Sequence, residues 1–287
     1  MLADSLERYR PELLPDVRRF CRHLPNWGYV RRIIEWHEKS GYPGSCWVWR
    51  VRGRVAAFQA VAFLNPDDAW LWGMRVDPAF AGKGVATRFT RALFPVVRAA
   101  GRNWVGLNTL DHRTPRPTFR VAEKLGMSLD DTDAVDVFWN LPGRYRAPRL
   151  EKLRDIRGRF ARAGRKTIFH QDPGWLWSRL LPARRRWLNP NGFALQGTPL
   201  HLVRQGLGRY SSWDLPSITV NLAERPDDLT RFVRPLLGLA RGKHVLALAY
   251  RADWRREFHA ALREVEPGLK RHRNCFWSCW RVYGRTV

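Results

Sequence analysis

Acidic residues, cysteines and long apolar stretches are all scarce in this chain of 287 residues. Its 26 Asp and Glu are outnumbered by 51 Lys and Arg, which gives a formal net charge of +25 at pH 7. No apolar run approaches the ~18 residues of a membrane-spanning helix, and no charged-then-apolar leader opens the sequence. The four cysteines, Cys21, Cys46, Cys275 and Cys279, do not form two Cys/His pairs at zinc spacing. We therefore expect a cytoplasmic protein with reduced thiols, no membrane contact and no metal.

The positive charge is concentrated in the second half of the chain. Residues 1–143 hold 21 Arg and Lys against 15 Asp and Glu, a net +6, whereas residues 144–287 hold 30 against 11, a net +19. The densest part, residues 144–187, also carries three tryptophans. Such a segment can hold nucleic acid through phosphate contacts and base stacking. The alternative is a solvated basic linker in an arginine-rich chain, and we favour this alternative.

The stretch VDPAFAGKGVATRF, residues 76–89, places Gly82 and Gly84 on either side of Lys83. An aromatic and aliphatic run before it predicts a strand that ends at an Asp-Pro turn, and apolar residues after it recur at helical spacing. The first N–H groups of a helix lack intrahelical partners and carry partial positive charge, so this junction suits a phosphate. The glycines keep side chains away from those amides, and Lys83 adds a positive charge. The stretch therefore predicts a pyrophosphate site.

Neither common nucleotide-binding glycine signature fits this stretch. A Rossmann fingerprint requires a third glycine where Thr87 stands, and the Walker spacing is absent. The stretch instead resembles the acetyl-CoA loop of the GCN5-related N-acetyltransferases (GNAT), [RQ]-x-x-G-x-[GA], here residues 81–86 and preceded by Val76-Asp77-Pro78. Farther along, AEKLGM at residues 122–127 resembles the family's Y-E-K-L-G-F segment. Two matched segments at the family's separation make this resemblance specific.

The resemblance implies an α+β fold with a mixed α/β sheet, in which acetyl-CoA is a cosubstrate and no metal takes part. The pantetheine arm would lie between two splayed strands, and an amine would attack the thioester directly while a backbone N–H near Met74 stabilises the oxyanion. The implied residues of the acetyl-CoA site are Met74, Arg75, Val76, Gly82, Lys83, Gly84, Val85, Ala86, Thr87 and Asn108.

Two positions depart from the family pattern. Ala81 replaces the usual arginine or glutamine of the loop, so the diphosphate would rely on backbone amides, Lys83 and Arg88. Ala122 stands where many members carry the tyrosine that protonates the departing thiolate. Candidate catalytic groups are Asp111 and His112, which follow the predicted fifth strand, and Glu35 on the predicted second helix.

The expected organisation is tandem. The element order β-α-α-β-β-β-α-β-α-β predicts a GNAT domain over residues 1–143, followed by a basic connector over 144–214. Residues 215–287 read as β-α-β-α-β, which resembles the second half of the same fold without a glycine loop. The leading hypothesis is an N-acetyltransferase for a small amine or amino acid. One alternative is a transferase whose donor or acceptor is carried on RNA, and another is a catalytically silent CoA-binding protein.

Overall fold

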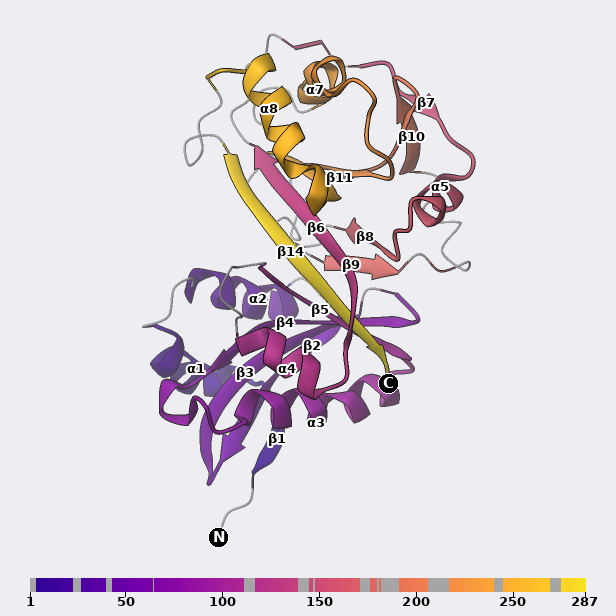
Figure 1. Cartoon of the computed structure of the whole chain (residues 1–287). Helices are drawn as coiled ribbons and strands as arrows, with labels where there is room; N and C mark the ends of the chain where they lie inside the picture. Colours follow the sequence, from indigo (N-terminus) through magenta and orange to yellow (C-terminus); the bar gives the residue numbers. More distant parts are fainter. Residues whose placement is uncertain are drawn as a thin grey trace. The chain divides into compact units, whose positions relative to one another are not determined.

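The computed structural model of the chain describes residues 4–22, 27–39, 43–63, 65–110, 117–138, 145–146, 148–170, 176–179, 181, 191–205, 217–239, 245–268 and 275–287. The chain packs into two compact units (Figure 1). The first unit comprises Met1–Thr109, Thr114–Leu129 and Tyr283–Val287, and the second comprises Leu110–Arg113 and Asp130–Val282.

The first unit has the order of elements that the sequence predicts. These elements are β1 (Ser5–Arg8), α1 (Leu14–Cys21), α2 (Trp27–Lys39), β2 (Gly44–Val51), β3 (Arg54–Phe63), β4 (Asp68–Val76), α3 (Val85–Ala99), β5 (Trp104–Leu110), α4 (Pro117–Lys124) and the first residues of β6 (Ser128–Phe138). The strands follow the order β1-β2-β3-β4-β5, antiparallel except for the parallel pair β4–β5. The predicted mixed sheet is thereby confirmed.

Helices cover both faces of this sheet (Figure 1). Val85, Phe89, Leu93 and Val97 form the apolar stripe of α3, and all four are buried in one cluster with sheet residues such as Leu71. On the other face, the Trp36 ring of α2 stacks on Trp72 with 5.4 Å between ring centroids. The spacing of apolar residues thus explains why α3 packs where it does.

The C-terminal end of the chain belongs to the first unit. Tyr283 is 6% exposed and packs in the same cluster as α3, and the Val287 N–H donates to the Asn103 carbonyl at 2.9 Å. The Ser128 hydroxyl donates to the Gly284 carbonyl at 3.1 Å. The predicted domains, 1–143 and 215–287 with a connector between them, therefore divide the chain differently from the packing, because strand pairing joins segments that are distant in the sequence.

The second unit is also a sheet with helices. Its elements are the rest of β6, β7 (Glu151–Lys152), α5 (Ile156–Arg162), β8 (Thr167–His170), β9 (Leu176–Arg179), β10 (Gly192–Leu195), β11 (Thr198–Gln205), β12 (Ser217–Leu222), α7 (Leu229–Leu237), β13 (Val245–Arg251), α8 (Arg255–Val265) and most of β14 (Cys275–Thr286). The strand order is β14-β6-β13-β12-β11-β10-β7, with β12 and β13 parallel, and β8 and β9 form a separate hairpin. The β-α-β-α-β order predicted for residues 215–287 is present.

Residues 144–214, expected as a connector, contain elements of this second unit. Leu195, Leu200 and Leu202 of β10 and β11 are buried in its core. Arg165 is 3% exposed and pairs with the buried Asp133 at 2.5 Å, while the Trp177 indole N–H donates to the same carboxylate at 2.8 Å. Burial raises the pKa of Asp133 to about 6 against the attraction of Arg165. Arg165, Asp133 and Trp177 are therefore buried parts of the second unit and are not solvated.

Candidate functional site

Strands β4 and β5 separate at the end where the sequence places the site. Their parallel pairing runs from Asp68–Trp104 to Leu71–Leu107, yet β4 continues to Val76 and β5 continues to Leu110. On its other edge, β4 stays paired with β3 through Val76 and Ala57. The Asp77 N–H donates to the Ala56 carbonyl of β3 at 2.8 Å. Because the N–H and C=O groups of successive residues in a strand point to opposite edges, those of Val76 point to the open edge. An extended ligand can therefore pair with this free edge.

A β-bulge lies where the strands separate. The register between β3 and β4 shifts between Phe58 and Ala60, and Gly73 has φ of +66°, a left-handed conformation that favours glycine. Beyond the bulge, Met74 and Val76 pack on the α3 side of the sheet, the side that Leu71 also faces. The bulge thus changes which residues of β4 face α3. The Arg75 guanidinium donates to the Met74 carbonyl at 2.7 Å.

The glycine loop leads directly into α3. Gly82 and Gly84 have φ of +74° and +71°, and a side chain at Gly82 would meet nothing within 4 Å. The glycines are therefore required by the backbone conformation and not by lack of space. Gly84 is the N-cap of α3 without a side-chain cap, and the first turn contains no acidic residue. The N–H groups of Val85, Ala86 and Thr87 precede the first intrahelical bond, from Arg88 N–H to Gly84 carbonyl at 3.1 Å.

Two cationic side chains lie on the loop. The Lys83 ammonium donates to the Ala79 carbonyl at 2.9 Å, and the Arg88 guanidinium donates to the Lys83 carbonyl at 2.8 Å. Arg88 also pairs with Asp4 at 3.1 Å, so part of its charge is compensated. Lys83 and the free helix amides are the positive groups that an arriving diphosphate would meet.

Asp77 anchors the start of the loop. Its buried carboxylate accepts hydrogen bonds from Arg19 at 2.6 Å, from Arg54 at 3.0 Å and from the Ala79 N–H at 3.0 Å. Burial pushes the pKa of Asp77 upward, but the Arg19 and Ala79 hydrogen bonds and the two guanidinium charges outweigh it, so the pKa is lowered. The Val-Asp-Pro segment therefore fixes the direction in which the chain leaves β4.

Of the three predicted catalytic residues, the structure describes Glu35 alone. Asp111 and His112 lie outside the residues that it describes. Glu35 is half-buried and forms an i, i+4 ion pair with Arg31, 3.6 Å between Arg31 Nε and Glu35 Oε1. Asn108 is half-buried and lies one residue beyond the last paired position of β5. All four assignments stay predictions.

Tyr29 was not singled out from the sequence, although it lies near this end of β4. Its ring contacts Trp72 edge-on at 6.2 Å between centroids. Burial raises the pKa of Tyr29 to about 12, and the nearby charge of Arg75 opposes the rise. A lone tyrosine at the start of an amphipathic helix carries no spacing signal that would have marked it. Ala122, by contrast, is fully buried in the α3 cluster and serves packing.

Two of the four cysteines have described side chains, and both are buried. Cys21 and Cys46 are free and 1% and 5% exposed. Burial raises the pKa of the Cys21 thiol to about 12, with Arg75 opposing, and raises that of Cys46 well above its usual value. Neither is therefore a nucleophile near neutral pH.

In the described parts of the chain, no helix is long and apolar enough to cross a membrane.

Parts of this chain are similar to known proteins in sequence and in fold. Residues 10–126 match the sequence model of the Acetyltransferase (GNAT) family. Among solved structures, a putative acetyltransferase from Thermoplasma acidophilum is 15% identical, with a TM-score of 0.50 over 96% of this chain and 88% of that chain. A GNAT family acetyltransferase from Elizabethkingia anophelis with acetyl-CoA bound is 8% identical, with a TM-score of 0.38 over 46% of this chain and 80% of that chain. A comparison with curated protein sequences finds no match.

The Thermoplasma structure supports the fold alone, because its identity to this chain is low. The family match covers the parts that matter for the site: it includes the open edge of β4, the left-handed glycine loop, all of α3 and the AEKLG segment up to residue 126. Residues 10–126 of this chain are therefore similar, in sequence pattern and in these structural features, to the Acetyltransferase (GNAT) family.

Proposed function

We propose that the first unit is an acetyl-CoA-dependent N-acetyltransferase that transfers the acetyl group directly to a small amine or amino acid. The observation that carries the proposal is the free edge of β4, from Trp72 to Val76, beside the uncapped N-terminus of α3. An extended pantetheine arm has amide groups that can pair with such an edge. A diphosphate has the charge that the helix amides and Lys83 attract.

The geometry supports the following binding roles. Peptide groups of Met74 and Val76 pair with the arm, and N–H groups of Val85, Ala86 and Thr87 bind the diphosphate together with Lys83. The Met74 carbonyl already accepts a bond from Arg75, so a ligand N–H shares its second lone pair. Asn108, beyond the last β4–β5 pair, borders the same opening.

The reaction needs an unprotonated amine and a leaving thiolate. The amine nitrogen attacks the thioester carbonyl, the C–N bond forms, and the C–S bond breaks with its electron pair going to sulfur. The amine proton passes to Asp111 or His112, or to water. Because an ordinary thiol has a pKa near ~8.5, the thiolate can leave without the tyrosine that Ala122 replaces. A backbone N–H at Met74 stabilises the developing oxyanion.

A second candidate is a CoA-binding protein that has lost turnover. The observation that favours it is Ala122, whose fully buried side chain can donate no proton. The two candidates bind the same ligand, so only turnover separates them.

The test is release of free thiol from acetyl-CoA in the presence of a panel of small amines and amino acids. Acceptor-dependent release that falls by about 10-fold or more in Lys83→Glu supports the N-acetyltransferase, since a charged hydrogen bond to phosphate contributes about that much. Lys124→Glu is the matched control, because Lys124 is an exposed residue of α4 in the same unit. Binding of acetyl-CoA without release for any acceptor supports the silent protein instead.

A further inference from the structure

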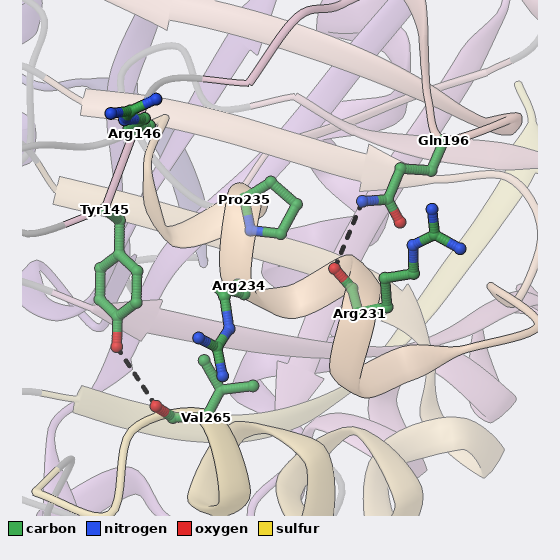
Figure 2. A pocket seen from close by; sticks show the side chains of 7 residues that line it. All are labelled: Tyr145, Arg146, Gln196, Arg231, Arg234, Pro235 and Val265. Carbon is green, nitrogen blue, oxygen red and sulfur yellow. Dashed lines mark hydrogen bonds between the residues drawn. The ribbon is translucent and has the colours of Figure 1, made fainter.

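The second unit contains a cavity of about 640 Å³ that none of the predicted site residues lines. Its described lining residues are Tyr145, Arg146, Gln196, Arg231, Arg234, Pro235 and Val265 (Figure 2). They come from the segment before β7, the β10–β11 turn, α7 and the end of α8. This volume is in the range of small-molecule sites, roughly 300–1,000 Å³.

Three of these residues are arginines, and no described acidic side chain pairs with them. No acidic side chain is among the described residues that line the cavity. Within the described structure, the guanidinium groups of Arg146, Arg231 and Arg234 make no ion pair or hydrogen bond. Other arginines of this unit do have acidic partners, such as Arg251 with Asp253 at 2.9 Å. The cavity is therefore a local concentration of positive charge that favours an anion.

A hydrogen bond and close backbone packing position the residues next to these arginines. The buried Tyr145 hydroxyl donates to the Glu266 carboxylate at 2.5 Å and lies 3.4 Å from the Val265 carbonyl. A Cβ at Gly238 would lie 1.9 Å from the Arg146 carbonyl oxygen, so the backbone of Arg146 rests on the end of α7. Tyr145 thereby places Arg146 at the cavity and forms a hydrogen bond with the Glu266 carboxylate.

Arg231 and Arg234 are one turn apart on α7, which puts them on neighbouring positions of one helix face. Gln196 occupies the β10–β11 turn with φ of +51°, a strained conformation for a non-glycine residue. Its side-chain amide donates to the Arg231 carbonyl at 3.4 Å (Figure 2). Figure 2 shows Arg146 and Arg231 on different sides of Pro235. The charges are thus spread around the cavity, which suits a ligand with more than one anionic group.

We propose that this cavity binds a ligand carrying at least two phosphate groups. Guanidinium groups pair with phosphate oxygens through two parallel hydrogen bonds, which a carboxylate-free, arginine-lined cavity of this size provides at several points. The phosphates belong either to a free phosphorylated molecule or to a stretch of nucleic-acid backbone. None of the described residues that line the cavity belongs to the glycine loop.

The experiment uses the full chain carrying Lys83→Glu, so that the glycine loop contributes no phosphate binding. Inorganic pyrophosphate and a single-stranded RNA oligonucleotide are titrated separately by calorimetry at low and physiological salt. Arg231→Gln with Arg234→Gln, added to that chain, is expected to weaken binding about 10-fold or more. The matched control Arg256→Gln removes an exposed arginine of α8 that does not line the cavity, and binding should be unchanged.

The outcomes separate the sources of phosphate. Arginine-dependent binding of pyrophosphate alone identifies a free phosphorylated molecule, and arginine-dependent binding of RNA alone identifies a nucleic-acid backbone. If both bind, competition between them shows that they share the cavity. If neither probe binds, or if Arg256→Gln weakens binding as much as the double variant, the proposal is wrong. Should the double variant fail to fold, Arg146→Gln, outside any helix, gives the same comparison.

Discussion

Asp77 connects the sheet to the glycine loop through a carboxylate that is almost fully buried. Asp77→Ala should lower the free energy of unfolding at pH 7 by about 2 kcal/mol, because it removes two charged hydrogen bonds and the bond to Ala79. The loss is smaller than for a fully buried pair, since Arg54 is half exposed. Urea unfolding measures it, with Glu123→Ala on the exposed face of α4 as control.

The lowered pKa of Asp77 gives this contribution a definite pH dependence. A depressed carboxyl pKa stabilises the folded state above the unfolded pKa, near ~3.9, and the stabilisation is lost as pH falls through the folded pKa. The difference in stability between the wild type and Asp77→Ala should therefore be constant from pH 7 to about pH 5 and shrink below pH 4. A difference that instead grows on acidification contradicts this.

Replacing Gly84 or Gly28 by alanine should change the stability of the protein in opposite directions. Gly84→Ala forces an L-residue to φ of +71° and should cost about 1–2 kcal/mol, although its Cβ would meet only Arg88 at 3.4 Å. Gly28 lies in α2 with no atom within 4 Å of an added Cβ, so Gly28→Ala should stabilise by about 0.5–1 kcal/mol. Thermal unfolding of both variants checks the signs.

At the scale of elements, β14 ends inside the first unit. Tyr283→Ala should destabilise this unit by about 3 kcal/mol, because the ring is buried among α3 and α4 residues and contacts Phe119 at 6.1 Å between centroids. Tyr283→Phe keeps the ring and should cost little. Chemical unfolding in which the alanine variant matches the wild type would show that the C-terminal residues do not belong to this core.

Local signals explain why the elements of the site could be predicted. The Asp-Pro turn, the glycine pair and the i, i+4 stripe from Val85 each act over a few residues, and the structure has β4, the loop and α3 there. Long-range pairing left no such signal, so the membership of residues 283–287 in the first unit was missed. In residues 144–214 the hairpin strands are short and lie between prolines and glycines, so the sequence of this segment predicted an irregular connector. The glycine inside β4, Gly73, was the available sign of the bulge.

At the scale of the whole molecule, the two units differ in how far their parallel strands stay paired. Pairing of β12 with β13 runs from Ser217–Val245 to Asn221–Ala249 and thus nearly to the end of β12, whereas β4 leaves β5 at Leu71. The helix after β12 is capped by Asp228, whose carboxylate accepts from the Arg231 N–H at 2.9 Å. A carboxylate already occupies the place where a diphosphate would bind, so α7 offers no counterpart to the glycine loop.

The most direct test of the central claim is a calorimetric titration of acetyl-CoA into the full chain and three variants. We predict one equivalent of tight binding in the wild type, unchanged in Lys124→Glu and in Arg231→Gln with Arg234→Gln, and weakened about 10-fold or more in Lys83→Glu. No binding at high micromolar acetyl-CoA, or binding that Lys83→Glu leaves intact, would contradict the assignment of the β4 edge and the glycine loop as the acetyl-CoA site.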